Sequence, residues 1–159
     1  MSVEIERKFL VKDDSWRTDA HGQRIAGIPF RQGYLPTADA TTVRVRLEGA
    51  TAKLTIKGKT EGFSRLEFEY TIPLQDAQQM LDTLCEKPLI EKVRYCRSDQ
   101  GYIWEIDEFA GDNHGLIVAE IELESEDEQP PLPDWVGAEV TGDPRYFNAA
   151  LVKHPFKDW

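Results

Sequence analysis

The stretch from residue 3 to residue 11 reads Val3-Glu4-Ile5-Glu6-Arg7-Lys8-Phe9-Leu10-Val11. Side chains of a β-strand alternate between two faces, so Glu4, Glu6 and Lys8 share one face and most of the apolar side chains share the other. Two carboxylates and an ammonium group on one face can hold a divalent cation and also contact a phosphate. For this strand alone, a half-exposed antiparallel strand with one wet face is the simpler interpretation. Similar patterns in later strands change that balance.

Seven further segments have the composition or the alternation of strands, and turn residues separate them. Gly49 breaks one alternating run and predicts a hairpin there. We expect these strands over residues 28–35, 41–48, 52–59, 65–73, 90–97, 102–109 and 116–124. Strands and helices do not alternate regularly, which indicates an antiparallel sheet that curves or closes.

One clear helix is expected over residues 75–85, where apolar side chains recur at helical spacing between two prolines. We expect its apolar side chains to pack against the protein rather than to hold a cofactor: Ala77, Met80, Leu81, Leu84 and Cys85. Shorter helices are expected around Trp16 and over residues 143–153. Residues 125–133 are acidic and rich in proline, which indicates a loop.

The composition indicates one globular protein, and we expect a single domain over residues 1–159. The formal net charge of −10 argues against duplex nucleic acid or an anionic membrane as a partner. No apolar run reaches the ~20 residues that span a bilayer, and the charged N-terminus does not resemble a signal peptide. Cys85 and Cys96 are the only cysteines, so we expect free thiols and a cytoplasmic location.

Charges on the polar strand faces are sorted by sign. Three strands carry basic pairs, which are Arg44 with Arg46, Lys53 with Lys57, and Lys92 with Arg94. Three others carry acidic groups, which are Glu67 with Glu69, Glu105 with Asp107, and Glu120 with Glu122 and Glu124. Same-face neighbours lie ~6.6 Å apart along a strand, and like charges there repel each other. The sorting therefore favours basic strands that face acidic strands across a shared space.

Two architectures follow from these faces. An acidic β-sandwich would bury the apolar faces and leave the charged faces in water. A closed eight-stranded antiparallel β-barrel would enclose the charges, and its interior has room for side chains or one small ligand. The charge sorting favours the barrel, a mainly β (α+β) fold with a few flanking helices. The helices look too few to cover its apolar outer face, so we expect a second copy of the chain to cover the rest in a homodimer.

The expected interior suits a polyanion bound together with a divalent metal. Arginine and lysine neutralise phosphate oxygens, and carboxylates hold hard cations such as Mg²⁺ or Mn²⁺. Zinc is a poorer fit, because His21, His114 and His154 are isolated and neither cysteine has a ligand-spaced partner. No glycine-rich phosphate loop is present, so side chains would hold the phosphates. No serine or cysteine nucleophile motif stands out.

The chain resembles the CYTH superfamily, also called triphosphate tunnel metalloenzymes, over nearly its whole length. Residues 4–8 have the Glu-x-Glu-x-Lys form of the first strand of that family. Later segments are similar to its strand motifs in the same order, namely residues 31–35, 44–46, 54–57, 65–69, 91–95, 105–107 and 120–122. Residues 140–146 are similar to the end of its short bacterial members. The first motif alone occurs by chance, whereas the ordered set is specific.

The resemblance implies an eight-stranded tunnel that binds a triphosphate and uses Mg²⁺ or Mn²⁺. The motifs are most similar to those of bacterial inorganic triphosphatases, so we expect hydrolysis of inorganic triphosphate (tripolyphosphate) to diphosphate and phosphate. Thiamine triphosphatase and class IV adenylate cyclase are alternatives within the fold. The His-Phe-like element of the cyclases is not found. Both alternatives require recognition of an organic group, and no aromatic side chain stands out that could stack on a base or on thiamine, since Trp104 lies on the apolar side of its strand. A non-catalytic polyphosphate-binding module is a further alternative.

Site residues follow from the resemblance by position. The expected phosphate ligands are Lys8, Arg44, Arg46, Lys57, Lys92 and Arg94, and the expected metal ligands are Glu4, Glu6, Asp107, Glu120 and Glu122. Lys8, Arg44, Arg46 and Arg94 would stabilise charge on the transferred and leaving groups. Either Glu4 or Glu120 would position or deprotonate the attacking water. Further candidates would bind substrate or form salt bridges within the tunnel, and these are Lys53, Arg65, Glu67, Glu69 and Glu124.

Overall fold

The structure is a computed structural model that describes residues 3–62 and 64–159. In this part of the chain it has nine strands, β1 (Val3–Val11), β2 (Ile28–Leu35), β3 (Thr42–Glu48), β4 (Thr51–Lys57), β5 (Ser64–Thr71), β6 (Ile90–Asp99), β7 (Tyr102–Phe109), β8 (Ile117–Glu122) and β9 (Val136–Glu139). It also has two α-helices, α1 (Leu74–Thr83) and α2 (Asn148–Lys153), and short 3₁₀ turns. The strands expected from the sequence all form, with ends that differ by at most two residues.

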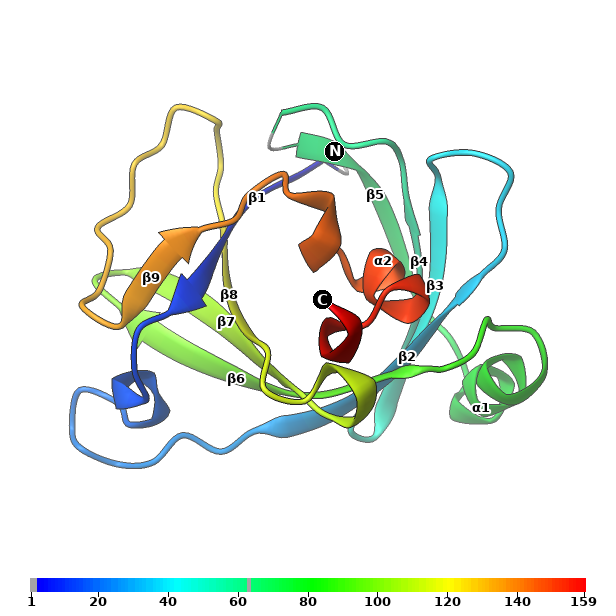
Figure 1. Cartoon of the computed structure of the whole chain (residues 1–159), viewed down its shortest axis with the longest axis horizontal. Helices are drawn as coiled ribbons and strands as arrows, with labels where there is room; N and C mark the ends of the chain where they lie inside the picture. The colour runs from blue at the N-terminus through cyan, green and yellow to red at the C-terminus, as the bar shows by residue number, and fades with distance from the viewer. Residues whose placement is uncertain (1–2, 63) are drawn as a thin grey trace.

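Strands β1 to β8 form a closed antiparallel barrel (Figure 1). The order around the barrel is β5-β4-β3-β2-β6-β7-β8-β1, and β1 then returns to β5. Among the described residues, this last contact consists of residues 3–5 paired with residues 64–66. The predicted eight-stranded closed barrel is therefore confirmed, and β9 is one strand more than the sequence predicted.

The alternation of each strand decides which side chains enter the barrel. In β3, Arg44 and Arg46 line the interior, whereas Val45 between them points outward and is fully buried against α1. The neighbouring strand β4 behaves in the same way, with Lys53 and Lys57 inside and Leu54 outside among apolar side chains. The polar faces are therefore inside and the apolar faces outside.

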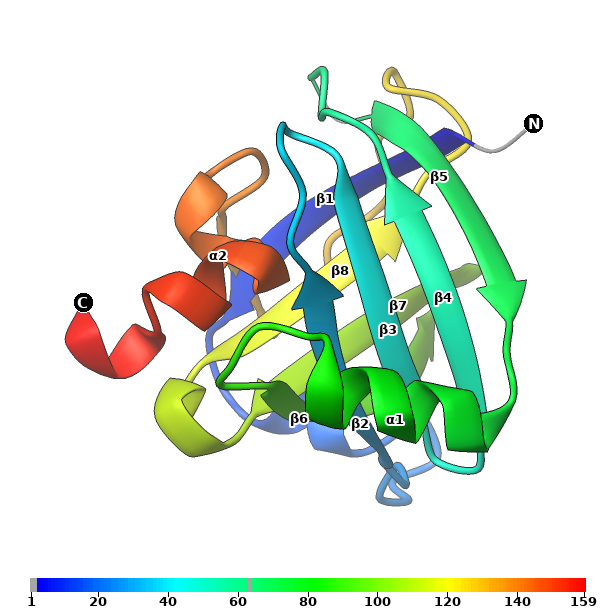
Figure 2. The same cartoon turned by 90° about the vertical axis from the view of Figure 1, so that its right-hand side faces the viewer.

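Helix α1 covers the outer face of β3 and β4 (Figure 2). Ala77, Leu81 and Cys85 are buried there against Val45 and Ala52. The expected packing of this helix is thus confirmed for these three side chains.

One residue of the predicted helix behaves differently. Leu84 is 59% exposed, so its predicted packing role is wrong. The reason is that α1 ends at Thr83, and Leu84 occupies the cap position, where it no longer follows the buried face of the helix.

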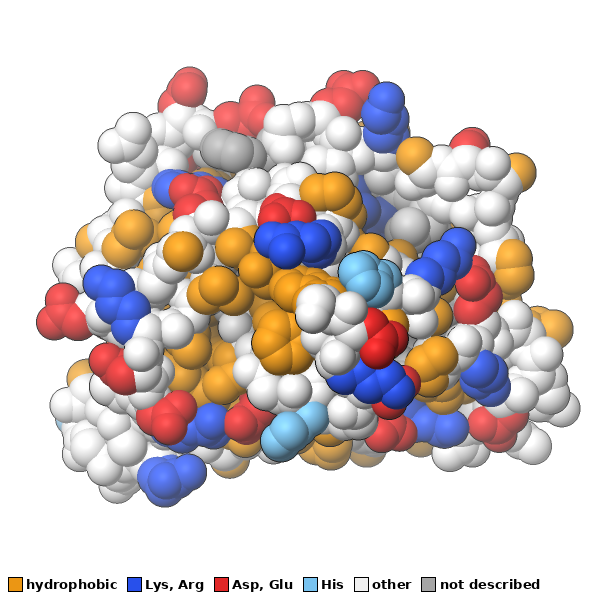
Figure 3. Space-filling model, viewed as in Figure 1, with side chains coloured by type: hydrophobic (Ala, Val, Ile, Leu, Met, Phe, Trp, Pro, Cys, Tyr) orange, Lys and Arg blue, Asp and Glu red, His pale blue; other side chains and the backbone are white. Residues whose placement is uncertain are grey.

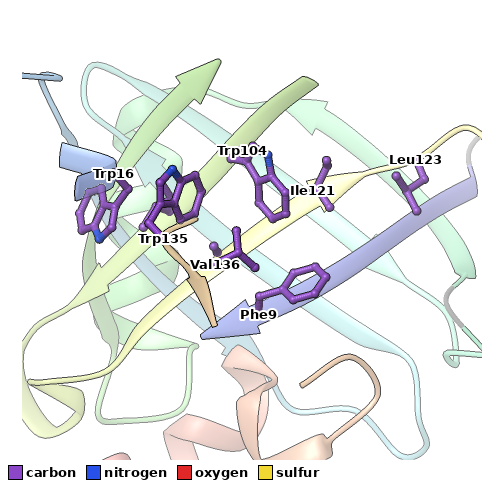
Figure 4. Packing of buried hydrophobic residues seen from close by; sticks show 9 residues of the cluster. Phe9, Trp16, Trp104, Ile121, Leu123, Trp135 and Val136 are labelled. Carbon is purple, nitrogen blue, oxygen red and sulfur yellow. The ribbon is translucent and has the colours of Figure 1, made fainter. Parts of the chain in front are cut away.

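A second apolar cluster covers the outer side of β1, β7 and β8 (Figure 4). Its centre is the fully buried Trp104, whose ring packs edge-on against Phe9 at 5.6 Å and against Trp135 at 5.4 Å between centroids. Trp135 precedes β9, which pairs with the end of β1 at Phe9 and Val11. Pairing of β9 with β1 therefore keeps Trp135 packed over the outer face of the barrel wall.

The sequence did not predict β9 because its four residues Val-Gly-Ala-Glu show no extended alternation. Gly137 suits this place, since a Cβ there would lie 3.1 Å from the carbonyl oxygen of Leu10.

The C-terminal segment fills one end of the barrel. At that end the inward side chains of the strands are apolar, and Ile90, Phe109 and Val118 pack there with Leu151 and Val152 of α2. Figures 1 and 2 show this segment across one mouth of the barrel, and Figure 3 shows hydrophobic side chains gathered at the centre of that face. The expectation that all the short helical pieces cover the outer face is therefore wrong for the C-terminal ones.

The single short helix expected over residues 143–153 is two pieces. A 3₁₀ turn, Pro144–Tyr146, begins at Asp143, whose side chain accepts a hydrogen bond from the backbone N–H of Arg145. Phe147 is then extended, and α2 starts at Asn148. This break directs Phe147 and Asn148 into the barrel interior.

Part of the outer surface stays apolar and exposed. Leu66, Phe68 and Tyr70 on β5 are each at least 42% exposed. The homodimer remains a prediction that such a surface motivates. Among the described residues, no helix is both long and apolar enough to cross a membrane.

Candidate functional site

The barrel encloses a charged cavity of about 370 Å³. Fourteen of the sixteen site residues expected above line its walls. Twelve of them are Glu4, Glu6, Lys8, Arg44, Arg46, Lys53, Lys57, Arg65, Lys92, Arg94, Glu120 and Glu122. Glu67 and Glu69 also line it. Asp107 lies behind the wall, and Glu124 lies beyond the end of β8 and does not line the cavity. A volume of this size suits one small ligand.

The cavity is deepest toward the end that the C-terminal segment fills. The side chain of Lys92 is 1% exposed, and those of Arg44 and Arg94 are 9% and 11% exposed. At the other end, Lys53 and Glu69 are each 33% exposed. The exposure therefore rises along the barrel from a closed end to an open end.

Strands β3 and β6 bring four cations into the deep part, namely Arg44, Arg46, Lys92 and Arg94. In the sheet, β2 lies between β3 and β6 and presents uncharged side chains to the interior. Arg46 is buried close to Arg44 and Arg94, and burial together with these two charges lowers its pKa to about 10. This crowding of positive charge suits a polyanion, because bound phosphate oxygens would relieve it.

Four carboxylates face the cavity from the adjoining strands β1 and β8, namely Glu4, Glu6, Glu120 and Glu122. Glu6 pairs in register with Glu122, and Lys8 pairs with Glu120. Burial, followed by the negative charge of Glu120, raises the pKa of Glu6 to about 8. Burial and the neighbouring carboxylates also raise the pKa of Glu122. In the absence of a cation, these carboxylates therefore hold protons more readily than ordinary carboxylates do.

A hard divalent cation fits this wall by its donor chemistry. Glu6, Glu120 and Glu122 offer carboxylate oxygens, the ligands that Mg²⁺ and Mn²⁺ prefer. Within the described part of the chain, no three acidic, histidine or cysteine side chains already form a cluster at metal-binding distance. The same carboxylates repel one another, as the raised pKa of Glu6 shows, and a cation would remove that repulsion.

Glu4 is bound to cations of the wall. Its carboxylate accepts hydrogen bonds from Lys57 Nζ at 2.9 and 3.0 Å and lies 3.5 Å from Arg65 Nε. Burial acts to raise the pKa of Glu4, but a hydrogen bond from Glu67 and the charges of Lys57 and Arg65 outweigh it and lower this pKa to about 2. Glu4 is therefore an ionised counter-charge, and metal binding there would need an exchange of partners.

Asp107 has a different place from the one expected. It is fully buried, and its oxygens accept hydrogen bonds from Lys92 Nζ at 2.7 Å and from Arg94 Nε and a terminal Arg94 nitrogen at 2.7 and 2.8 Å. Burial would raise the pKa of Asp107, but the two cations hold it well below its usual range. Both oxygens are occupied, so the structure does not favour Asp107 as a metal ligand.

Several cavity residues were absent from the expected site. Phe30, Glu48, Glu105, Phe147 and Asn148 all line the cavity. The alternation of the strands could have revealed the first three. Phe30 shares a face of β2 with Tyr34, which also lines the cavity. Glu48 shares a face with Arg46, and Glu105 shares a face with Asp107. No pattern in the sequence marks Phe147 or Asn148, because they follow an irregular turn.

Comparison with known proteins now identifies the family. A model of the CYTH domain matches residues 2–150 of this chain. The chain belongs to the CYTH family. The CYTH resemblance found in the sequence is therefore confirmed.

Two curated CYTH relatives match along almost their whole length. An inorganic triphosphatase of Acetivibrio thermocellus is 48% identical over 159 residues, which is 100% of this chain and 99% of the relative. An inorganic triphosphatase of Nitrosomonas europaea is 40% identical over 154 residues, which is 94% of this chain and 97% of the relative.

Solved structures share this CYTH fold. The crystal structure of the inorganic triphosphatase NE1496 is similar with a TM-score of 0.66 and 35% identity, over 94% of this chain and 97% of that one. A putative adenylate cyclase from Bacillus halodurans is similar with a TM-score of 0.62 and 18% identity, over 84% of this chain and 96% of that one. The second likeness shows the fold alone.

Proposed function

We propose that this CYTH protein hydrolyses inorganic triphosphate to diphosphate and phosphate with the help of a divalent cation. The observation that carries the proposal is the cavity in which Arg44, Arg46 and Arg94 share one enclosed space with Glu6, Glu120 and Glu122. The two curated relatives with 48% and 40% identity are both inorganic triphosphatases. Their similarity covers 100% and 94% of this chain.

The phosphates would lie along the basic wall, from the deep end toward the mouth. Lys92 is the most buried cation, with a side chain that is 1% exposed, and Arg65 and Lys53 are the most exposed at 17% and 33%. The others lie between, at 7–11%, and these are Arg46, Lys8, Arg44, Arg94 and Lys57. Arginine binds phosphate oxygens by two parallel hydrogen bonds, and lysine acts as a point charge. A compact inorganic polyanion suits this wall because nearly all the contacts it offers are cationic.

Glu6, Glu120 and Glu122 would hold the cation, which we take to be Mg²⁺ or Mn²⁺, and Glu4 lies beside them. When bound, such a cation would neutralise negative charge of the phosphates and make a water molecule more acidic. The protein's own part is to keep these carboxylates on the wall opposite the arginines, so that cation and phosphate meet in the space between.

The side chains would assist the transfer in two ways. Lys8, Arg44, Arg46 and Arg94 would neutralise charge that develops on the transferred and leaving phosphate groups, which is the main requirement of phosphoryl transfer. Glu120 would orient the attacking water and accept its proton. Although burial opposes ionisation, Lys8 and Arg94 lower the pKa of Glu120, so the carboxylate is available as an acceptor.

The deciding experiment is a substrate panel with product identification. Tripolyphosphate, ATP and thiamine triphosphate are each incubated with Mg²⁺, with Mn²⁺ and with EDTA. We expect release of phosphate and diphosphate from tripolyphosphate with a divalent cation and little release with EDTA. Faster turnover of thiamine triphosphate, or formation of a cyclic nucleotide from ATP, would contradict the proposed substrate. Binding of tripolyphosphate without any release of phosphate would indicate a binding module instead.

The remaining expectations on partners stay predictions. A homodimer, a cytoplasmic location and the lack of duplex nucleic acid or membrane partners rest on the sequence arguments given above. They do not affect the chemistry of the cavity.

A further inference from the structure

Two uncharged amide side chains have no role in the chemistry described above, and one of them lies behind the basic wall while the other lines the cavity at its side. Gln32 on β2 is fully buried, and Asn148 is the first residue of α2. Both are connected to cations of the cavity by hydrogen bonds. Their arrangement indicates a further function for each in the proposed reaction.

The hydrogen bonds form one continuous chain. Arg46 Nε donates to Gln32 Oε1 at 2.8 Å, Gln32 Nε2 donates to Asn148 Oδ1 at 3.1 Å, and Lys92 Nζ donates to the same Oδ1 at 2.8 Å. Arginine and lysine carry only donors, so an amide oxygen must face each of them. The NH₂ group of Gln32 is then left to face Asn148, which fixes the orientation of both amides.

We propose that Gln32 and Asn148 are positioning residues that hold Arg46 and Lys92 in place for binding the phosphates of the substrate. This inference rests on the proposed function, because it assigns these amides to the same site. They touch the cations rather than the substrate, so they act through Arg46 and Lys92.

The charge of the wall explains why amides occupy these positions. Arg44, Arg46, Lys92 and Arg94 repel one another in a buried space, and each needs a partner on its far side. Asp107 serves Lys92 and Arg94 but neutralises part of their charge. Arg46 already has one counter-charge, Glu48, at 3.2 Å. Gln32 and Asn148 satisfy further donors of Arg46 and Lys92 without adding more negative charge to the wall.

The aromatic ring of Phe30, which neighbours Gln32 on the inward face of β2, supports the same arrangement. The guanidinium carbons of Arg46 and Arg94 each lie 4.8 Å from the centre of this ring, and Lys92 Nζ lies 5.9 Å from it. Cations are attracted to the face of an aromatic ring. Strand β2 thus presents an uncharged surface that keeps the cations of β3 and β6 apart and in fixed positions.

Asn148 also links the wall to the segment that fills the closed end. It is the one member of the chain of hydrogen bonds that comes from outside the barrel strands, and α2 is anchored by Leu151 and Val152. The position of Lys92 is therefore tied to that segment through the side chain of Asn148.

The test compares Asn148→Ala and Gln32→Leu with a matched control, Asn113→Ala. Asn113 is also a buried amide, and its Oδ1 accepts a hydrogen bond from the backbone N–H of Phe156 at 2.8 Å, outside the cavity. The affinity for tripolyphosphate is measured by calorimetry in EDTA, where no hydrolysis is expected, and folding is checked by circular dichroism. Gln32→Leu alters a fully buried site, and the half-buried Asn148 supplies the variant that is expected to fold.

We expect the Kd for tripolyphosphate to rise about tenfold in Asn148→Ala and in Gln32→Leu, since each loses a charge-assisted hydrogen bond. The Asn113→Ala control keeps the wild-type Kd. The double variant Gln32→Leu/Asn148→Ala loses much less than the product of the two single effects, because both belong to one chain of hydrogen bonds. In turnover with Mg²⁺, the loss appears mainly in KM and only weakly in kcat.

The outcomes distinguish a failure of the inference from a failure of the proposed function. An unchanged Kd and KM in Asn148→Ala overturns the inference, and so does an equal rise in Asn113→Ala, which would indicate general loss of structure. Wild-type protein that binds tripolyphosphate but does not hydrolyse it contradicts the proposed function, while the ratio of the Kd values still tests the positioning. Wild-type protein that does not bind tripolyphosphate at all overturns both.

Discussion

Lys92 Nζ lies 2.7 Å from Asp107 Oδ2, and both side chains are only 1% exposed. The same carboxylate also pairs with Arg94 through two hydrogen bonds. Removal of one partner from such a buried group leaves uncompensated charge, which costs far more than loss of a pair on the surface. The pair therefore matters for the stability of the barrel as well as for the basic wall.

We predict that Asp107→Asn lowers the free energy of unfolding by about 3 kcal/mol, because two buried cations lose their counter-charge. Urea denaturation measures this change. The control is Glu139→Gln, which breaks the more exposed pair of Glu139 with Arg7 at 2.7 Å. That substitution is expected to cost less than about 1 kcal/mol. Equal effects of the two variants would contradict the structural role given to Asp107.

The second prediction concerns the acidic wall. Glu6→Gln and Glu122→Gln each remove a carboxylate proposed to hold the cation, so we expect the Mg²⁺ concentration for half-maximal phosphate release to rise at least about tenfold. Glu124→Gln is the matched control, since Glu124 follows the same strand but does not line the cavity. Full metal-dependent turnover in Glu6→Gln and Glu122→Gln at low Mg²⁺ would show that the metal ligands are assigned wrongly.

The third prediction concerns pH in the absence of metal. Burial and Glu120 raise the pKa of Glu6 to about 8, and burial with Glu4 raises that of Glu67 to about 7. At these two groups the folded protein holds more protons than the unfolded chain between pH 5 and pH 7, so their contribution to stability falls as the pH rises through this window. Thermal unfolding in EDTA at pH 5, 6 and 7 measures the slope.

Glu6→Gln provides the check on this pH dependence. The variant cannot lose that proton, so its midpoint of unfolding should vary less between pH 5 and pH 7 than that of the wild type. Addition of Mg²⁺ should stabilise the wild type more at pH 7 than at pH 5, because cation and proton compete for the carboxylate. The same slope in variant and wild type would mean that other groups cause it.

The fourth prediction concerns the closed end of the barrel. Leu151 is fully buried among inward-facing side chains, so Leu151→Ala is expected to lower the free energy of unfolding by about 3 kcal/mol. Leu84→Ala makes the same change at a residue that is 59% exposed, and it should cost less than about 0.5 kcal/mol. Chemical denaturation of both variants measures the difference. Similar costs would show that the C-terminal segment does not pack inside the barrel.

Strand positions and the identity of the inner face could be predicted, because both follow from polar and apolar side chains that alternate with a period of two residues. Arg44 and Arg46 alternate with Val45, and charge repulsion decides which of the two faces must be enclosed. Four-residue β9 could not be found in this way, since Val136–Glu139 is too short for an alternation to emerge. This segment is extended because it pairs with β1, which is distant in the sequence.

The candidate site was predicted only as far as the alternation of the strands allows. That alternation says that Asp107 faces inward, but it does not say how deep the residue lies, and depth decides whether a carboxylate meets a metal or a buried cation. Asn148 illustrates a different limit. Its place follows from the break at Phe147 and from the packing of Leu151, which are contacts between distant parts of the chain.

Because the C-terminal segment closes one end of the barrel, substrate would enter and products would leave through the other end. A linear polyphosphate would have to enter with its terminus first, and its interior bonds would reach the carboxylates only as far as the chain can slide inward. After cleavage, the fragment nearer Lys92 would be trapped until the fragment nearer Lys53 departs. The closed end would thus determine the order in which the products leave, and excess diphosphate in the solvent would inhibit release of the inner fragment by occupying the open end.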